Sequence, residues 1–296
     1  MVDAELRPRR SVLYMPGANE RALEKAQTIP ADALILDLED AVAPDAKPEA
    51  RDRVCAAATS GAYGTREIAI RANGIGTAWH DDDLRAIAAA GPGAVVVPKI
   101  NSAADVHLIE RALEAGGAPD HTMIWAMLET PIAMLSALEI ASSSERLAVL
   151  VMGTNDLAKE LQASHVPGRL PLLAGLGHCL LAARAAGKVI LDGVYNDIKD
   201  DAGFLAECEQ GRDLGFDGKT LIHPSQVDPC NTTFAPTPAE IETAGRIIAA
   251  FEEAEADGRG VVTVDGRMVE NLHVEQARRT LAIVSAVGAI VAEVGR

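Results

Sequence analysis

Charged side chains follow several short apolar segments of this chain, and two of the carboxylates have the chemistry of a metal site. Glu129 comes directly after the apolar segment 122–128, and Asp156 stands shortly after the next one, 147–153. Two carboxylates that leave positions open for water and substrate oxygens suit Mg²⁺, a hard ion that keeps several waters. The same two residues could instead cap helices or pair with arginines, and the sequence leaves both interpretations open.

Arg71 ends another apolar segment, 68–70. A buried guanidinium is costly unless it meets an anion. Arg71 is therefore expected either to bind a substrate carboxylate or an enolate oxygen, or to form a structural salt bridge with Glu39 or Asp40. Asp37 lies inside the preceding apolar segment, which predicts a buried polar network. One of the three carboxylates is expected to support Arg71 or a metal-bound water, and structural roles for the others remain an alternative.

Five further residues carry weaker signals. Asn155 precedes the second carboxylate of the metal pair and could orient the site through its amide. Tyr14 and Lys25 flank a Pro-Gly turn before a predicted helix, where an anionic ligand tail could bind; ordinary charges on a helix surface explain this pattern equally well. Lys99 and His223 also follow apolar segments. We expect a solvated lysine and a hydrogen-bonded histidine in the core.

Eight short apolar segments alternate with stretches of helical spacing and would position all of these residues. The segments are 11–14, 33–38, 68–71, 94–98, 122–128, 147–153, 188–194 and 218–222. Continuously apolar runs are typical of parallel strands buried on both faces. Thr130 before Pro131 marks a helix start one residue after Glu129. The pattern predicts an α/β fold, a closed (β/α)8 TIM barrel, with the chemistry where the strands end.

The chain has 296 residues, more than the roughly 250 that such a barrel needs. Three prolines in 228–238 predict a break, so we assign 1–230 to the catalytic barrel and 231–296 to a C-terminal extension. The extension is expected to contain a helix at 239–256, a hairpin formed by 261–264 and 267–269, and a final helix at about 271–294. We predict that this helix–hairpin–helix acts as a lid or an oligomer contact.

Composition excludes several classes of function. The formal charge is −16, from 27 Lys and Arg against 43 Asp and Glu, which disfavours nucleic acid and anionic membranes as partners. The four cysteines include no C-x-x-C pair, so neither a zinc ribbon nor a disulfide framework is indicated. The first ten residues lack the apolar core of a signal peptide, and the segment 281–294 is too short for a membrane helix. We therefore predict a cytoplasmic protein.

The segments around the candidate residues resemble the citrate lyase β-subunit / malyl-CoA lyase family of the HpcH/HpaI aldolase superfamily. In the family's order they are RSVLYMPG (10–17), LDLEDAV (36–42), IRANG (70–74), MLETP (127–131), GTNDL (153–157), and GFDGK (215–219) with IHPSQ (222–226). Six ordered motifs are specific for the family and poorly specific for the substrate.

The resemblance implies a Mg²⁺-dependent carbon–carbon lyase that acts on a 3-hydroxyacyl-CoA thioester. Malyl-, citramalyl- or citryl-CoA would be split into an acyl-CoA and a 2-oxo acid. By the same resemblance, Glu129 and Asp156 bind Mg²⁺, Arg71 and Glu129 contact the substrate, and Tyr14 and Lys25 lie near coenzyme A or the acyl thioester. It also implies a homotrimer or a hexamer.

One position departs from the family's pattern. In the lyases an aspartate of the C-terminal hairpin reaches the neighbouring subunit's site as an acid/base, and the matching place here carries Glu270. Because the carboxyl is retained on a longer stem, we predict that Glu270 protonates the enolate carbon after cleavage. A surface glutamate without a catalytic role is the alternative.

Three other functions remain possible on the same residues. The first is hydrolysis of a 3-hydroxyacyl-CoA thioester of the malyl-CoA type. The second is aldol chemistry on a free 2-oxo acid, and the third is an accessory lyase subunit of a multi-enzyme complex. The intact carboxylate pair and Arg71 argue against a non-catalytic subunit.

Overall fold

The computed structural model of the protein describes residues 7–256 and 261–294. The chain forms two compact units: one comprises Arg9–Phe234, and the other comprises the described residues from Ala235 onward together with Arg7 and Pro8. We placed the division after residue 230, at the start of a proline-rich break. The break begins later than expected, because 227–234 form helix α10 (Val227–Phe234). Pro229 lies in its first turn, where the backbone N–H that proline lacks has no partner within the helix.

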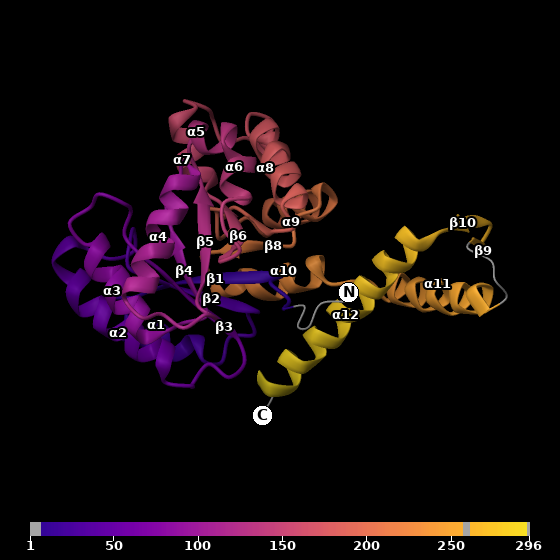
Figure 1. Ribbon diagram of the computed structural model, residues 1–296, viewed down its shortest axis with the longest axis horizontal. Coiled ribbons are helices and arrows are strands. Elements are labelled where there is room, and N and C mark those ends of the chain that lie inside the picture. The colour runs from indigo at the N-terminus through magenta and orange to yellow at the C-terminus, as the bar shows by residue number, and fades with distance from the viewer. Residues whose placement is uncertain (1–6, 257–260, 295–296) are drawn as a thin grey trace. The chain divides into compact units, whose positions relative to one another are not determined.

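Eight parallel strands close into a barrel in chain order, with β8 paired to β1 (Figure 1). The strands are β1 (Ser11–Pro16), β2 (Ala33–Asp37), β3 (Glu67–Arg71), β4 (Ala94–Val97), β5 (Met123–Leu128), β6 (Leu147–Met152), β7 (Val189–Asp192) and β8 (Gly218–Leu221). Each lies within or overlaps one of the eight predicted segments, and the predicted TIM barrel is confirmed.

Helices surround the strands on the outside of the barrel (Figure 1). In addition to α10 they are α1 (Glu20–Ala26), α2 (Lys47–Thr59), α3 (His80–Ala90), α4 (Ala103–Ala115), α5 (Pro131–Leu135), α6 (Ala137–Ala141), α7 (Thr154–Glu160), α8 (Leu173–Ala185) and α9 (Asp201–Leu214). Short 3₁₀ helices are η1 (Pro44–Ala46), η2 (Pro167–Arg169) and η3 (Pro224–Gln226). Thr130 caps α5 as predicted, since its side chain accepts a hydrogen bond from the N–H of Ala133.

The strands separate two hydrophobic cores. In β2, Ala33 and Ile35 belong to the cluster inside the barrel, whereas Leu34 and Leu36 belong to the cluster between the strands and the helices. Side chains of a strand alternate between its two faces, so a strand buried on both faces must be apolar at successive positions. Asp37, the next inward position of β2, is the first residue above the apolar interior.

The amino-terminal end of the barrel is closed by a charged pair over an aromatic ring. Trp125 is fully buried in the interior cluster, and the guanidinium of Arg9 lies 5.5 Å from its ring centre. Arg9 also donates two hydrogen bonds to the carboxylate of Glu67, at 2.6 and 2.9 Å. The interior is therefore a packed core, and the open end of the barrel is the carboxyl end of the strands.

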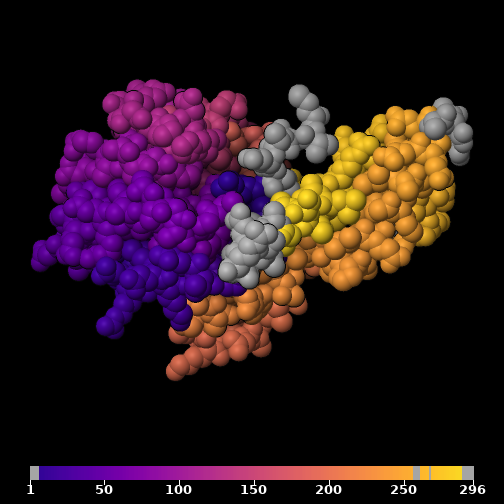
Figure 2. All heavy atoms as spheres, turned by 90° about the horizontal axis from the view of Figure 1, so that it is seen from below, coloured from indigo at the N-terminus to yellow at the C-terminus, as the bar shows by residue number. Residues whose placement is uncertain are grey.

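The second unit contains α11 (Pro238–Ala256), β9 (Val262–Val264), β10 (Arg267–Val269) and α12 (Asn271–Val294). The helices α11 and α12, orange and yellow in Figure 2, pack against each other, and β9 pairs antiparallel with β10. Phe251, Val269 and Val274 form a small core of this unit. No helix in the described part of the chain combines the length and apolarity needed to cross a bilayer. A role of this unit as a lid or an oligomer contact stays a prediction.

Closure of the barrel depends on a glycine at the seam between β8 and β1. A methyl group on Gly218 would overlap the main-chain oxygen of Arg9 and lie 2.7 Å from that of Arg10. Because backbone atoms cannot rotate away, we expect Gly218→Ala to reduce the free energy of unfolding by about 3 kcal/mol, the upper end for overpacking. Urea unfolding followed by circular dichroism measures the loss.

Gly177→Ala is the matched control. Gly177 lies inside α8, and a methyl group there would meet no atom within 4 Å. Replacing a helical glycine by alanine should raise stability by about 0.5–1 kcal/mol. Equal stability of the two variants would show that the seam tolerates a side chain.

Candidate functional site

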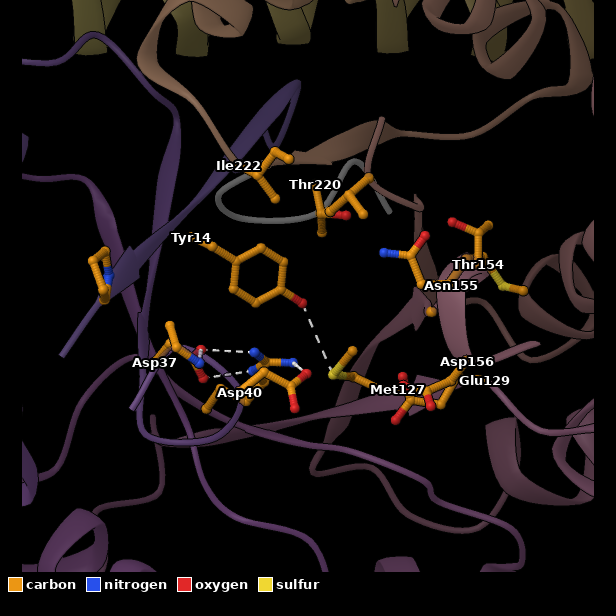
Figure 3. A pocket seen from close by; sticks show the side chains of 16 residues that line it. Tyr14, Asp37, Asp40, Met127, Glu129, Thr154, Asn155, Asp156, Thr220 and Ile222 are labelled. Atoms are coloured by element: carbon orange, nitrogen blue, oxygen red, sulfur yellow. Dashed lines mark hydrogen bonds and ion pairs between the residues drawn. The ribbon is translucent and has the colours of Figure 1, made fainter. Parts of the chain in front are cut away.

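A cavity of about 450 Å³ lies at the carboxyl ends of the strands. Six of the predicted site residues line this cavity: Tyr14, Asp40, Arg71, Glu129, Asn155 and Asp156. Figure 3 shows the ring of Tyr14 in the middle, Asp37 and Asp40 on one side, and Glu129 and Asp156 together on the other. The structure thus brings the carboxylate pair and the arginine to one pocket.

Strand alternation explains why these residues meet. Val12, Ile35, Ala69 and Met127 all face the interior of the barrel. Two residues further along the same strands come Tyr14, Asp37, Arg71 and Glu129, which therefore also face inward. They form the layer that covers the apolar interior at its open end.

Arg71 is held mainly by Asp37. Its Nε and Nη2 donate to the two carboxylate oxygens of Asp37, at 2.6 and 2.7 Å. The third nitrogen, Nη1, lies 2.8 Å from Glu39 and 3.5 Å from Asp40. The guanidinium also stacks on Tyr14, 4.9 Å from the ring centre. Burial opposes the charge of Arg71, but these carboxylates outweigh it and raise the pKa of the guanidinium.

The structural salt bridge that the sequence left open is therefore present, and its main partner is Asp37. Asp37 is 1% exposed, and its carboxylate also accepts the N–H groups of Glu39 and Ala41 at 2.8 and 3.1 Å. The predicted buried polar network around Asp37 is present in the structure. Because Asp37 takes two of the arginine's nitrogens, only Nη1 is free to exchange a carboxylate partner for a ligand.

Among the carboxylates around Arg71, Glu39 has a pKa close to neutral pH. Burial raises the pKa of Glu39 to about 7, against the lowering effect of Arg71 and with a further rise from Asp40. Burial likewise raises the pKa of the Tyr14 hydroxyl. Tyr14 thus stays neutral at physiological pH, while Glu39 exists in both forms and can accept or donate a proton.

Glu129 and Asp156 form the other side of the pocket. The Oε1 of Glu129 accepts the backbone N–H of Lys99 at 2.8 Å, and the ammonium of Lys99 lies 3.8 Å from Oδ1 of Asp156. Lys99 has a left-handed backbone with φ of 53°, uncommon for a residue with a side chain. Lys99 is exposed, as expected of a solvated lysine, and it also lies at the carboxylate pair, where its backbone and its side chain each contact one carboxylate.

The carboxylate pair fits a divalent cation. Gly153 directly follows the neighbouring strand β6, and a methyl group there would overlap Oε2 and Cβ of Glu129. The glycine thus leaves the space that Glu129 occupies. Throughout residues 7–256 and 261–294, no group of three or more His, Cys, Asp or Glu side chains could hold a metal ion. A metal would take Glu129 and Asp156 and fill its other positions with water or substrate oxygens, as Mg²⁺ does.

The electrostatics of the pair also favour a cation. Burial and, to a smaller extent, the nearby charge of Asp156 raise the pKa of Glu129 to about 7, although the hydrogen bond from the backbone of Lys99 lowers it. Two adjacent carboxylates resist full ionisation unless a positive charge lies between them. A divalent ion would remove this repulsion.

The remaining predicted residues lie in different surroundings. Asn155 exchanges two hydrogen bonds with the amide of Asn196, at 3.1 and 2.7 Å, at the rim of the pocket. Lys25 is exposed on α1 and does not line the pocket, so its role near coenzyme A stays a prediction. His223 is exposed rather than in the core, and its Nδ1 accepts the N–H of Ser225. Glu270 is exposed in the second unit, and its acid/base role stays a prediction.

Sequence reasoning missed two contributors to this site. Gly153 could have been found by counting two residues beyond Val151, an inward position of β6. Lys47 is 5% exposed and donates to the main-chain oxygens of Leu38 and Glu39. No sequence signal distinguishes it from a surface lysine at a helix start.

Comparison with known proteins identifies the family. The family model described as HpcH/HpaI aldolase/citrate lyase matches residues 10–224. The chain belongs to this family. A relative from Cereibacter sphaeroides named (3S)-malyl-CoA thioesterase is 55% identical over 282 residues, which cover 95% of this chain and 96% of the relative. The citrate lyase subunit beta of Escherichia coli is 38% identical over 281 residues, 93% of each chain.

Solved structures of this family show the same fold. The CitE protein of Mycobacterium tuberculosis in complex with magnesium, acetoacetate and coenzyme A has a TM-score of 0.75 and 30% sequence identity. The match covers 94% of this chain and 97% of CitE. The expected family is thereby confirmed, and one of its members binds magnesium and coenzyme A.

The space at Gly153 predicts a specific loss of metal binding. Gly153→Ala should displace Glu129 and weaken Mg²⁺ binding about 10- to 100-fold, the range for residues that orient metal ligands. Isothermal titration with MgCl₂ measures the affinity. Gly74→Ala is the control, because a methyl group there meets only Pro98, at an ordinary 3.7 Å. Equal affinities of the two variants would contradict this role of Gly153.

The raised pKa of Glu129 predicts that protons compete with Mg²⁺. Metal ligands must be deprotonated, and half of the Glu129 side chains are protonated near pH 7 without metal. The affinity for Mg²⁺ should therefore rise from pH 6 to 8 and fall about tenfold for each unit well below 7. Magnesium-dependent shifts in melting temperature at several pH values test this. A pH-independent affinity that persists in Glu129→Gln would place the metal elsewhere.

Proposed function

We propose that this protein is a Mg²⁺-dependent enzyme that hydrolyses a 3-hydroxyacyl-CoA thioester of the malyl-CoA type. The observation that carries the choice of reaction is the 55% identity, over 95% of the chain, to a protein named (3S)-malyl-CoA thioesterase. The pocket supports it with the carboxylates of Glu129 and Asp156 opposite the guanidinium of Arg71. Water would be consumed, and free malate and coenzyme A would be released.

Each side of the pocket has a separate task in this proposal. When bound by Glu129 and Asp156, Mg²⁺ supplies a Lewis acid that binds substrate oxygens. Arg71 provides a fixed positive charge for the oxyanion that develops at the thioester carbonyl. Because Asp37 holds two of its nitrogens, the guanidinium is oriented before substrate arrives, and Nη1 is the nitrogen that faces the developing charge.

Glu39 is the proposed general base. A base is most effective when its pKa lies near the working pH, and the pKa of Glu39 is about 7. Glu39 removes a proton from water as the oxygen attacks the thioester carbon. The carbon–sulfur bond then breaks, and the protonated Glu39 returns its proton to the leaving sulfur, which releases the thiol and restores the carboxylate. Glu39 does not line the 450 Å³ pocket itself but a second cavity of about 560 Å³, and Asp40 lines both. The exposed carboxylate of Asp40 helps to hold Arg71 while Glu39 changes charge.

Carbon–carbon cleavage is the second candidate, because relatives named citrate lyase subunit beta cover 93% of the chain at 38% identity. The β-hydroxyl of the substrate would lose its proton, the bond would break to an acyl-CoA enolate and a 2-oxo acid, and Arg71 would face the enolate oxygen. Glu270, from the second unit of another copy, would protonate the enolate carbon. This version requires the predicted homotrimer or hexamer.

Product analysis distinguishes the two reactions. The protein is incubated with malyl-CoA and MgCl₂, with and without EDTA, and products are separated by liquid chromatography. We expect malate and free coenzyme A in equal amounts, and no turnover with EDTA. Acetyl-CoA with glyoxylate would identify the lyase instead. Turnover that persists in EDTA would reject the metal-dependent proposal in both versions.

Glu39→Gln tests the general base separately from the metal. The amide keeps the shape but cannot accept the proton, so kcat should fall about 100-fold or more, while Mg²⁺ affinity stays within a factor of two or so. Asp156→Asn is the comparison, since it should lose metal affinity as well as turnover. A Glu39→Gln variant with normal kcat would reassign the base.

A further inference from the structure

A buried lysine lies behind the acidic side of the pocket. Lys47, the first residue of α2, is 5% exposed and directs all three N–H groups of its ammonium to oxygen acceptors. They are the carbonyl oxygens of Leu38 and Glu39, at 2.7 and 2.8 Å, and Oδ1 of Asn73, at 2.6 Å. The half-buried ring of Trp79 covers the ammonium, 5.0 Å from its centre.

Lys47 differs from the other fully enclosed lysine of the barrel. Lys219 contacts two carboxylates, Asp192 at 3.0 Å and Glu207 at 2.7 Å, so its charge is neutralised where it lies. Lys47 has no carboxylate among the three acceptors of its ammonium. Its positive charge is instead directed at the main chain that carries Glu39, which is an unusual use of a buried ammonium.

The side chain of Asn73, which follows β3 and accepts a hydrogen bond from Lys47, is itself held in place. The amide nitrogen of Asn73 donates to Asp83 at 2.6 Å, which turns its oxygen toward Lys47. Asp83 is fully buried and also accepts Nε of Arg51 at 2.7 Å. The polar chain from Arg51 through Asp83 and Asn73 therefore gives Lys47 a rigid position between the ends of β2 and β3.

The segment after β2 is thus held from both sides. The Asp37 carboxylate accepts hydrogen bonds from the N–H groups of Glu39 and Ala41. On the other side, the ammonium of Lys47 donates hydrogen bonds to the carbonyl oxygens of Leu38 and Glu39. With its own N–H and C=O both fixed, Glu39 has a defined backbone, and its side chain can reach Nη1 of Arg71. We propose that Lys47 is a positioning residue that acts through these two carbonyls to aim the Glu39 carboxylate at the reacting atoms.

This inference rests on the proposed function of Glu39. The first of its two tests measures hydrogen exchange and does not depend on that function. Lys47→Met keeps most of the stem and removes the ammonium, so the carbonyls of Leu38 and Glu39 lose their partner. Hydrogen exchange followed by mass spectrometry should show about tenfold faster exchange in the segment 38–43, with the strands of the barrel unchanged.

The second arm measures turnover. A base displaced by about 1 Å is less effective, so kcat of Lys47→Met should fall about 10- to 100-fold, while KM for the thioester and the affinity for Mg²⁺ change by less than about threefold. Lys47→Arg retains a charged donor and should lose less of kcat than the Met variant. If the Met variant does not fold, the same two measurements are made on Lys47→Arg.

Lys188→Met is the matched control. Lys188 also donates to a main-chain oxygen, that of Ser144 at 3.0 Å, but it stands before β7 at the opposite end of the barrel. The Lys188→Met substitution should change neither kcat nor the rate of hydrogen exchange in the segment 38–43.

The outcomes separate the two hypotheses. Unchanged exchange in 38–43 would overturn the positioning role whatever the activity. Faster exchange with normal kcat, in a protein that Glu39→Gln inactivates, would show that Lys47 holds the segment without aiming the base. If the wild-type protein turns over no thioester, the proposed function fails, and the exchange arm alone decides whether Lys47 fixes the segment.

Discussion

The site depends on one buried charge, the guanidinium of Arg71, and on the carboxylates that keep it ionised. Without Asp37 the arginine would lose the partner of two of its nitrogens, and breaking such a buried pair costs about 3–5 kcal/mol. The two hydrogen bonds to Asp37 join the ends of β2 and β3 and fix the plane of the guanidinium. Tyr14 then covers one face of that plane. The guanidinium is thereby fixed so that only Nη1, which now faces Glu39 and Asp40, could exchange its partner for a developing oxyanion.

The two sides of the pocket use opposite electrostatic arrangements. On the Arg71 side, three acidic residues surround a buried cation that belongs to the protein itself. On the other side, Glu129 and Asp156 meet only the partly exposed ammonium of Lys99, at 3.8 Å. Because this ammonium is partly exposed and 3.8 Å away, it compensates the two carboxylates only in part, and the second side can take a divalent ion. The asymmetry explains why both sides are rich in carboxylates and only one resembles a metal site.

The rest of the barrel keeps these groups in place. Its interior is filled by apolar side chains up to the layer of Arg71, and Arg9 with Glu67 closes the opposite end over Trp125. At the end of β7, a second buried network links Asp192 with Lys219 of β8 and with Arg169. Strand ends held by buried ion pairs have little freedom to move, so the polar layer is organised before a ligand binds.

The sequence by itself determined the barrel and the inward residues of the site. Continuous apolar runs can be buried only as strands covered on both faces, and the polar residue at which each run stops must lie at the open end. The sequence also placed Glu129 and Asp156 just after two neighbouring strands, and the structure shows Asp156 in the first turn of α7. It could not decide which acid holds Arg71, because Asp37, Glu39 and Asp40 are equally near in the chain. Only the tertiary structure selects Asp37, since strand alternation turns that carboxylate inward beside Arg71. The same holds for Lys47 and Gly153, whose roles arise from contacts between segments about ten to thirty residues apart, at distances that local sequence patterns do not encode.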